Sequence, residues 1–345
     1  MEYNRAKMKQ EVKRIMKETR PRPIWVTLLY LLIVAVGGWL IQTVIGAVVG
    51  VSALADSFAG FAGRLDHYMD PELMMEALVE FLMANLHIIG SLISGSILIG
   101  ILSYLWNSTM AAGYVGYSLK MVRRQNADVG TIFSAFPKFG KVLITNILVG
   151  VFTFLWTLLF YVGLVIVVAI TALLMEAAEV VGVLLMIVGI VFFVIAMLWL
   201  TLRFALTNHL VMDQGISGLE ALTVSKKLMK GNKRRLFVLY LSFIGWYLLE
   251  LVIVYACVAV IVLAGFLMAE GAMGGIITGV ILMLVMLVVM VVALLLFNMW
   301  LTPYTSGATV KFYEYAMSCR PDMFHRETAA DTGDSFGNPN YPTLD

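Results

Sequence analysis

The chain has 345 residues, of which 61% are hydrophobic and only 13% are charged, whereas soluble domains carry about 25% charged residues. This composition excludes a water-soluble fold. The apolar residues come in long blocks separated by short charged segments, which indicates one membrane domain rather than two soluble ones. The two cysteines, Cys257 and Cys319, do not support a disulfide framework, and thiol-based redox or metal chemistry is not expected.

The N-terminal segment, residues 1–23, is predicted to form a cytoplasmic amphipathic helix. Between residues 2 and 20, apolar side chains recur at helical spacing among lysines and arginines, namely Met8, Val12, Ile15 and Met16. This pattern is typical of a helix that lies on an anionic membrane surface. Pro21 and Pro23 are expected to end it, because proline lacks the helical hydrogen-bond donor and disfavours helix in the residue before it.

Residues 24–316 are predicted to form a membrane domain with six transmembrane helices. The second span is longer than the ~20 residues that cross a bilayer, so we expect it to be tilted, broken near Gly113 or Gly116, or extended into the cytoplasm. The loops after the third and fifth spans are very short, which makes the spans on either side antiparallel neighbours. The expected spans cover about residues 24–51, 81–119, 142–174, 181–212, 236–268 and 276–302.

The expected fold class is therefore an all-α integral membrane protein with basic amphipathic interfacial helices. Segments 127–141 and 217–232 resemble the N-terminal helix in this role. A similar string around Trp156 and Trp246, 90 residues apart, suggests repeated hairpin units, although such strings also arise by chance in apolar helices. Residues 317–345 are polar and are expected to form a flexible cytoplasmic tail.

The distribution of lysine and arginine predicts the orientation. Segments 1–23, 120–141, 213–235 and 311–345 together hold 22 of the 24 basic residues, and the exceptions are Arg64 and Arg203. By the positive-inside rule these four segments lie in the cytoplasm, so both termini are cytoplasmic and the number of spans is even. The segment from 52 to 80, which is rich in aspartate and glutamate, is expected on the outside.

Several strings carry a family resemblance. The most specific runs from Ser225 to Trp246 and contains Ser-Lys-Lys-Leu-Met-Lys-Gly-Asn-Lys followed by Leu-Ser-Phe-Ile-Gly-Trp. The others are Ala112-Gly113-Tyr114, Tyr117-Ser118-Leu119-Lys120, Ile132-Phe133-Ser134-Ala135-Phe136, Pro303-Tyr304 and Phe312-Tyr313. Over about residues 4–316 the chain resembles the bacterial membrane proteins of the domain-of-unknown-function-975 family, from which its long outer segment, 52–80, departs. The resemblance implies a multi-span helical membrane protein and no particular activity.

Polar side chains within the predicted spans are candidates for an intramembrane site: Arg203, Asn208, Glu250 and Asn298. A charge at helix-centre depth costs at least about 2.5–3.5 kcal/mol, so Arg203 and Glu250 should face the bundle or a water-filled cavity. We predict that these two pair directly or through water. The alternative is that Arg203 snorkels to the cytoplasmic surface while Glu250 is protonated or reaches the outer face. His209, at the cytoplasmic end of a span, is expected to be solvated.

A basic run before the fifth span is a candidate site for anionic lipid headgroups: Lys226, Lys227, Lys230, Lys233, Arg234 and Arg235. Its position directly before a span favours headgroups over nucleic acid, and each basic residue near the surface contributes about 1 kcal/mol. Membrane lipids are therefore the expected partners, with a protein partner or a second copy as further candidates. No cofactor, metal site or catalytic motif is predicted.

Three functions remain open. A membrane adaptor or regulator that is not an enzyme, and that binds lipid or a partner protein, predicts no continuous polar path through the bundle. A transporter or translocator of a small or amphiphilic substrate predicts a cavity lined by intramembrane polar groups. An intramembrane enzyme predicts two or more catalytic side chains at one depth. The sequence favours the first of these, located in the bacterial cytoplasmic membrane.

Overall fold

The computed structural model describes residues 3–49, 57–61, 71–177, 179–269 and 273–321, and within these ranges it contains helices and no strand. Six helical segments are long and apolar enough to cross a membrane, which confirms the predicted all-α, six-span fold class. The long helices are α2 (Pro23–Val49), α5 (Leu86–Val122), α6 (Phe139–Ala177), α7 (Glu179–Phe204), α11 (Ile244–Ala269) and α12 (Met273–Ser318). The shorter elements are α1 (Arg5–Glu18), α4 (Pro71–Ala84), the 3₁₀ helix η2 (Val129–Ala135), α8 (Thr207–Asp213), α9 (Gly218–Leu228) and α10 (Lys233–Leu241).

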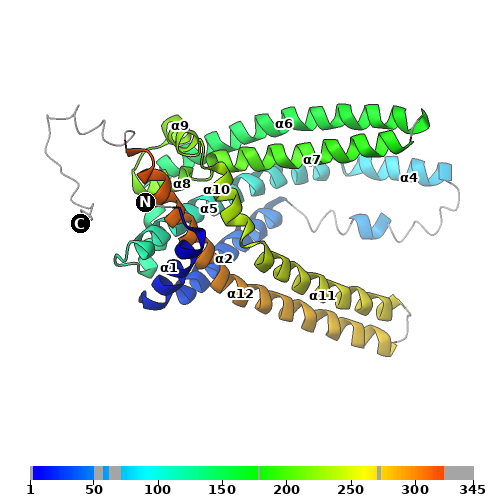
Figure 1. Cartoon of the computed structure of the whole chain (residues 1–345). Coiled ribbons are helices and arrows are strands. Elements are labelled where there is room, and N and C mark those ends of the chain that lie inside the picture. The colour runs from blue at the N-terminus through cyan, green and yellow to red at the C-terminus, as the bar shows by residue number, and fades with distance from the viewer. Residues whose placement is uncertain (1–2, 50–56, 62–70, 178, 270–272, 322–345) are drawn as a thin grey trace.

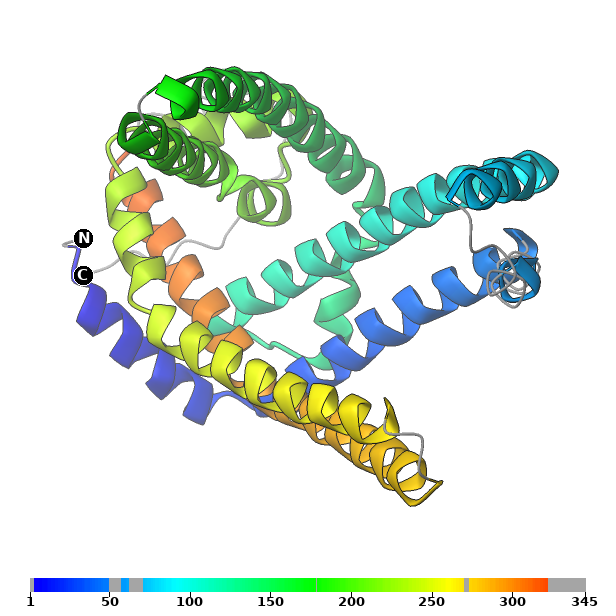
Figure 2. The ribbon, with the colours of Figure 1, turned by 90° about the vertical axis from the view of Figure 1, so that its right-hand side faces the viewer.

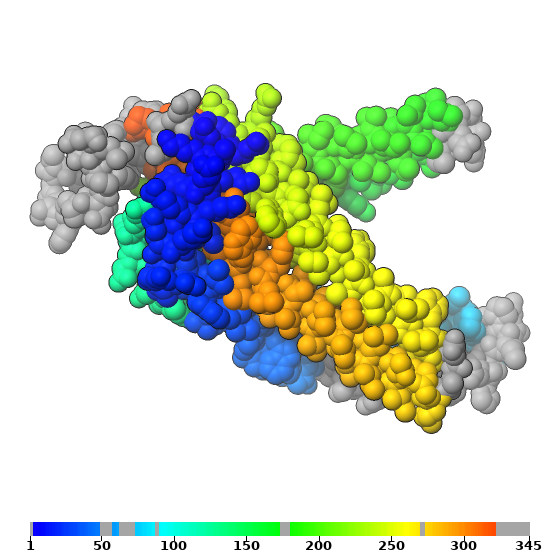
Figure 3. Space-filling model, turned by 60° about the horizontal axis from the view of Figure 1, so that its bottom comes forward, coloured from blue at the N-terminus to red at the C-terminus, as the bar shows by residue number. Residues whose placement is uncertain are grey.

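The long helices form three pairs, α2 with α5, α6 with α7, and α11 with α12 (Figure 1). The pairs diverge from the end of the molecule at which α1 and α8 to α10 lie (Figures 1 and 2). Figure 3 shows the tip of the α6–α7 pair standing apart from the α11–α12 pair. At most 11% of the most apolar window of any span is buried. Most of the apolar surface of the spans is therefore left to face lipid.

Burial is concentrated at the end from which the three pairs diverge, in a region that we call the hub. The hub consists of α1, η2, α8, α9 and α10 together with the C-terminal parts of α5 and α12. Its largest fully buried side chains include aromatic residues from α5, the α10–α11 turn and α12, namely Tyr117, Phe243, Tyr304, Phe312 and Tyr313. The last span was predicted to end near residue 302, but α12 continues to Ser318 because its final turns are packed into the hub.

Of the three alternatives for the long second span, a break near Gly113 or Gly116 is wrong. Helix α5 is continuous from Leu86 to Val122, through both Gly113 and Gly116. These glycines allow η2 to approach: a Cβ added at Gly113 would overlap the carbonyl oxygen of Ile132, and one at Gly116 would lie 2.7 Å from Ser134 Oγ. The span is long because its C-terminal end belongs to the hub.

Two predicted spans are broken where they reach the hub. The expected span 181–212 is divided after Phe204 into α7 and α8, and the expected span 236–268 is divided after Leu241 into α10 and α11. A hydroxyl lies at each break: Thr207 donates to the Phe204 carbonyl at 2.8 Å, and Ser242 donates to the Leu239 carbonyl at 2.6 Å. Local bonds of this kind offer the backbone an alternative to continuing the helix.

The predicted interfacial helices pack their apolar faces against protein, while most of their basic side chains stay exposed. The apolar face of α1 contacts α12 and α5, and its residues Val12 and Ile15 are 0% and 1% exposed. Helix α9 buries Ala221, Leu222 and Leu228, and segment 127–141 forms η2 and the start of α6. The same amphipathic pattern suits a membrane surface or a protein core, and here the hub covers it. Residues 52–56 and 62–70 of segment 52–80, and residues 322–345 of the predicted tail, lie outside the described residues.

Candidate functional site

Helix α1 meets the α10–α11 turn and α12 at a joint built around Phe243 and Tyr304. The two rings pack edge to face with their centroids 5.0 Å apart, and both side chains are almost fully buried. Lys9 of α1 extends over this pair: its Nζ lies 4.4 Å from the Phe243 centroid and donates to the carbonyl oxygen and to Oγ of Ser242, each at 3.2 Å. The joint therefore ties the amphipathic helix to the start of a span.

A basic hollow of about 330 Å³ opens on one side of this joint. Arg5, Lys9 and Lys13 recur every four residues, so they follow one face of α1. Burial lowers the pKa of Lys9 below its ordinary value, and the positive charges of Arg5 and Lys13 lower this pKa further. Three cations therefore share a small space. The principal lining residues are Arg5, Lys9, Lys13, Ser242, Trp246 and Tyr304.

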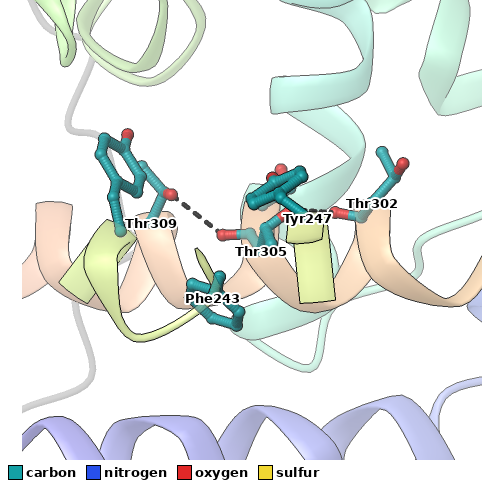
Figure 4. A pocket seen from close by; sticks show the side chains of 7 residues that line it. Phe243, Tyr247, Thr302, Thr305 and Thr309 are labelled. Atoms are coloured by element: carbon teal, nitrogen blue, oxygen red, sulfur yellow. Dashed lines mark hydrogen bonds between the residues drawn. The ribbon is translucent and has the colours of Figure 1, made fainter. Parts of the chain in front are cut away.

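A second hollow, of about 370 Å³, lies on the other side of the joint and is rich in hydroxyl groups. Figure 4 shows Thr302, Thr305 and Thr309 of α12 facing Phe243 and Tyr247. The threonines bond within their own helix: Thr309 donates to the Thr305 carbonyl at 2.9 Å, and Thr305 donates to the Thr302 carbonyl at 3.1 Å. The hollow is thus polar and uncharged, and the hydroxyl protons of Thr305 and Thr309 are already engaged.

A charged network joins three elements of the hub. Arg123, which follows α5, donates to Asp213 of α8 through Nη2 at 2.9 Å and to Glu314 of α12 through Nε at 3.4 Å. Asp213 also accepts from Tyr313 and from Gln214, each at 2.9 Å, and its side chain is only 9% exposed. The hydrogen bond that Arg123 donates to Asp213 raises the pKa of the guanidinium, because it stabilises the charged form.

The network extends to α1 through Lys311 of α12. Lys311 Nζ lies 3.0 Å from Glu11 of α1 and 3.5 Å from Glu314. The carboxylates of the network are thus each paired with a guanidinium or an ammonium. Their arrangement fits the role of holding helices together better than that of proton transfer, since every acid already has a fixed cation beside it. The sequence analysis missed this network, because its members are distant in the chain.

His209 is buried, so its predicted solvation is wrong. It is 5% exposed, and its ring packs against Tyr313 with centroids 5.5 Å apart. Neither ring nitrogen has a hydrogen-bond partner among the described residues. The physical reason is the break after Phe204, which turns α8 into the hub instead of letting the span end in water.

The four predicted intramembrane residues do not form one site. Asn298 donates to Glu250 at 2.7 Å within the α11–α12 pair. Arg203 lies near the end of α7, with its guanidinium carbon 5.4 Å from the Trp199 ring centroid, and Asn208 is in α8. The described residues contain no direct ion pair between Arg203 and Glu250, because the two belong to different helix pairs. The predicted direct pair is therefore not formed.

The predicted headgroup site divides into free and engaged cations. Lys233 Nζ lies 3.6 Å from the Trp199 ring centroid, and burial lowers the pKa of Lys233, as does, to a smaller degree, the charge of Arg203. Arg235 donates to the Tyr315 hydroxyl and to Asn232. These two contacts are with the protein itself. The remaining members are exposed, and no ion pair of the described chain includes them: Lys226, Lys227, Lys230 and Arg234.

The basic hollow on α1 was also missed by sequence reasoning. The spacing of Arg5, Lys9 and Lys13 is visible in the sequence, but it was interpreted only as the polar face of a surface helix. The other wall comes from Ser242 and Tyr304, more than 230 residues away in the chain. No local pattern indicates that contact.

Six apolar helices in three pairs, joined at one basic end, define a polytopic α-helical membrane protein. The family model described as "Protein of unknown function (DUF975)" matches residues 1–318, so the chain belongs to that family, as its sequence resemblance predicted. The comparisons with curated proteins and with solved structures give no match. The description of the family gives no activity, so the function has to be inferred from the site.

Proposed function

We propose that the protein is a membrane adaptor or regulator rather than an enzyme, and that it acts by binding anionic lipids at its hub. The observation that carries this proposal is the uneven distribution of packing. The hub is densely packed and basic, whereas at most 11% of the most apolar window of any span is buried. Spans arranged in this way present their walls to lipid, and the hub presents unpaired cations to headgroups.

Charge supports the same proposal. The described parts of the four basic segments, residues 3–23, 120–141, 213–235 and 311–321, hold 21 of the 24 basic residues and lie in or beside the hub. The positive-inside rule therefore assigns the hub and both termini to the cytoplasm of a bacterial cell. Anionic lipids of that leaflet attract cations close to the span ends. The exposed lysines of α9 and the segment after it, Lys226, Lys227 and Lys230, are free to meet them.

A translocator of an amphiphilic substrate is the second candidate, and two observations favour it. Glu250 and Asn298 place a polar pair inside the α11–α12 pair of spans, and the hydroxyl-rich hollow lies near the hub end of the same two helices. The divergence of the three pairs argues against it, because a transport path needs walls on several sides. The adaptor proposal therefore comes first.

Reconstitution of the full chain tests these two proposals. In nanodiscs of mixed phosphatidylcholine and phosphatidylglycerol, the lipid extracted with the protein should be enriched in phosphatidylglycerol. Replacing Lys226, Lys227 and Lys230 by glutamine should reduce this enrichment, by about fivefold in affinity for each charge removed. The matched control replaces the same three lysines by arginine and should keep the enrichment.

The same preparation distinguishes the translocator. Vesicles that contain a nitrobenzoxadiazole-labelled lipid are treated with dithionite, which reduces only the outer-leaflet label unless lipid crosses the bilayer. An adaptor should leave the inner-leaflet label protected. If the protein made that label accessible and Glu250→Gln abolished the effect, the adaptor proposal would be wrong and the translocator correct.

A further inference from the structure

The basic hollow between α1 and the α10–α11 turn has the construction of a ligand site. Its volume of about 330 Å³ falls at the lower end of the range of about 300–1,000 Å³ typical of small-molecule sites. Three cations point into it from one helix face, and none of them takes part in an ion pair of the described chain. A site with this charge and no acid of its own attracts an anion.

The position of the hollow indicates which kind of anion. Its floor is formed by Ser242 and Trp246, at the point where the basic segment gives way to the apolar helix α11. On the same face of α11, Trp246 and Leu249, three residues apart, are 38% and 46% exposed and apolar. An occupant would meet cations on one side and a lipid-facing wall on the other, which matches a phosphate group joined to acyl chains.

The chemistry of the cations fits a phosphate. The Arg5 guanidinium provides several N–H donors in a planar fork, and the ammonium groups of Lys9 and Lys13 provide point charges, so together they can surround a tetrahedral oxyanion. Lys9 is already fixed by its bonds to Ser242 and by the Phe243 ring, and a fixed donor loses little entropy on binding. The exposed lysines Lys226, Lys227 and Lys230 have no such fixed contact among the described residues.

We propose that Arg5, Lys9 and Lys13 form a specific binding site for the phosphate of an anionic phospholipid, against Ser242, Trp246 and Tyr304. The proposal deepens the proposed function, on which it rests for the choice of lipid. A bound phosphate would join α1 to the start of α11 and thereby strengthen the joint. The site differs from the general attraction of the α9 lysines, because it holds one phosphate in a defined position.

The test is a titration of the full chain in detergent with phosphatidylglycerol, followed by native mass spectrometry. Lys13→Gln should raise the apparent dissociation constant of the retained lipid by about fivefold, and Lys9→Gln with Lys13→Gln by about 25-fold. The matched control, Lys7→Gln with Lys17→Gln, removes two charges from the same helix outside the hollow and should leave the constant unchanged.

Two further arms make the outcome decisive. Lys13 makes no hydrogen bond within the described chain, so Lys13→Gln alone keeps the test valid if the Lys9 variant fails to fold. Inorganic phosphate is titrated separately: if it bound with the same variant pattern while no phospholipid was retained, the site would belong to free phosphate and the lipid assignment would be overturned. If the Lys9/Lys13 variant and the Lys7/Lys17 control lost equal affinity for phosphatidylglycerol, the proposal of a specific site would be overturned. In that case Lys226, Lys227 and Lys230 could still recruit anionic lipid, so the adaptor proposal would stand. The adaptor proposal itself fails only if the protein moves labelled lipid across the bilayer in the dithionite assay.

Discussion

Replacing Arg123 by glutamine should destabilise the protein far more than the same replacement of its neighbour Arg124. Arg123 joins α5, α8 and α12 through Asp213 and Glu314. Arg124 pairs only with Glu18, in an ion pair whose side chains are 54% and 50% exposed. The two variants remove the same charge from adjacent positions. The difference between their losses of unfolding free energy therefore reports the burial and geometry of the partner carboxylates.

The expected magnitude follows from the surroundings of Asp213. Removing one partner of a fully buried ion pair costs about 3–5 kcal/mol. The Asp213 side chain is 9% exposed, but it keeps its bonds from Tyr313 and Gln214, and the Arg123 side chain is 31% exposed. We therefore expect Arg123→Gln to lower the free energy of unfolding by about 2–3 kcal/mol, the range of lost hydrogen bonds to a charged group. Arg124→Gln should cost at most about 1 kcal/mol.

Unfolding in mixed micelles, by titration with sodium dodecyl sulfate and detection by far-ultraviolet circular dichroism, measures both losses. Asp213→Asn and the double variant Arg123→Gln/Asp213→Asn complete a double-mutant cycle. The double variant should lose less than the sum of the single variants, because each single variant leaves one group without its partner. Equal losses at Arg123 and Arg124, or an additive cycle, would show that the network does not hold the hub together.

Other predictions concern the spans, the turn before α6 and the orientation. In a double-mutant cycle, the losses of unfolding free energy for Arg203→Ala and Glu250→Ala should add within about 0.5 kcal/mol. The losses for Glu250→Ala and Asn298→Ala should instead show a coupling energy of about 0.6–1.7 kcal/mol. A coupling between Arg203 and Glu250 would contradict the structure. Thr131 donates to Asp128 and lowers the pKa of that carboxyl group. The stabilising effect of Asp128 should therefore be present above its unfolded pKa of about 3.9 and disappear as the pH falls through the lower folded value. Asp128→Asn should remove this acid-dependent loss of stability from thermal unfolding curves, and an unchanged loss would refute the assignment. Reporter fusions should give a cytoplasmic signal after residues 20, 130, 222 and 325 and an outside signal after 65, 178 and 271, and a cytoplasmic signal at 65 would refute the six-span orientation.

Hydropathy predicts the existence of the six spans because each contains a window apolar enough to cross a membrane. It fails where a helix leaves the bilayer and enters the protein interior, since both environments favour the same side chains. Helix α12 runs to Ser318 and α5 to Val122 for this reason. The apolar face of α1 is the clearest example: Val12 and Ile15 would suit a membrane surface, but they are buried against the hub.

The polar residues show a second limit of sequence reasoning. Depth along a span can be estimated from the helical rise, and Arg203 and Glu250 seemed close on that measure alone. Depth contains no information about the lateral position of a helix pair. Glu250 instead meets Asn298 of its own pair, and Arg203 meets Trp199 one turn away. Partners within a helix pair can thus be inferred from the sequence more safely than partners between pairs.

The division between hub and spans has an energetic basis. Apolar surfaces gain little from leaving lipid for one another, so helices in a bilayer associate mainly through close packing and polar contacts. Close packing is visible within the α11–α12 pair, where a Cβ added at Gly275 would lie 2.6 Å from the carbonyl oxygen of Leu267. Between the pairs, α12 contacts α2, and Tyr104 of α5 donates to the Asn146 carbonyl of α6. The hub adds aromatic burial and the network around Arg123 to this attraction. Substitutions in the hub should therefore change how the three pairs are held relative to one another, whereas apolar exchanges on their outer walls should not.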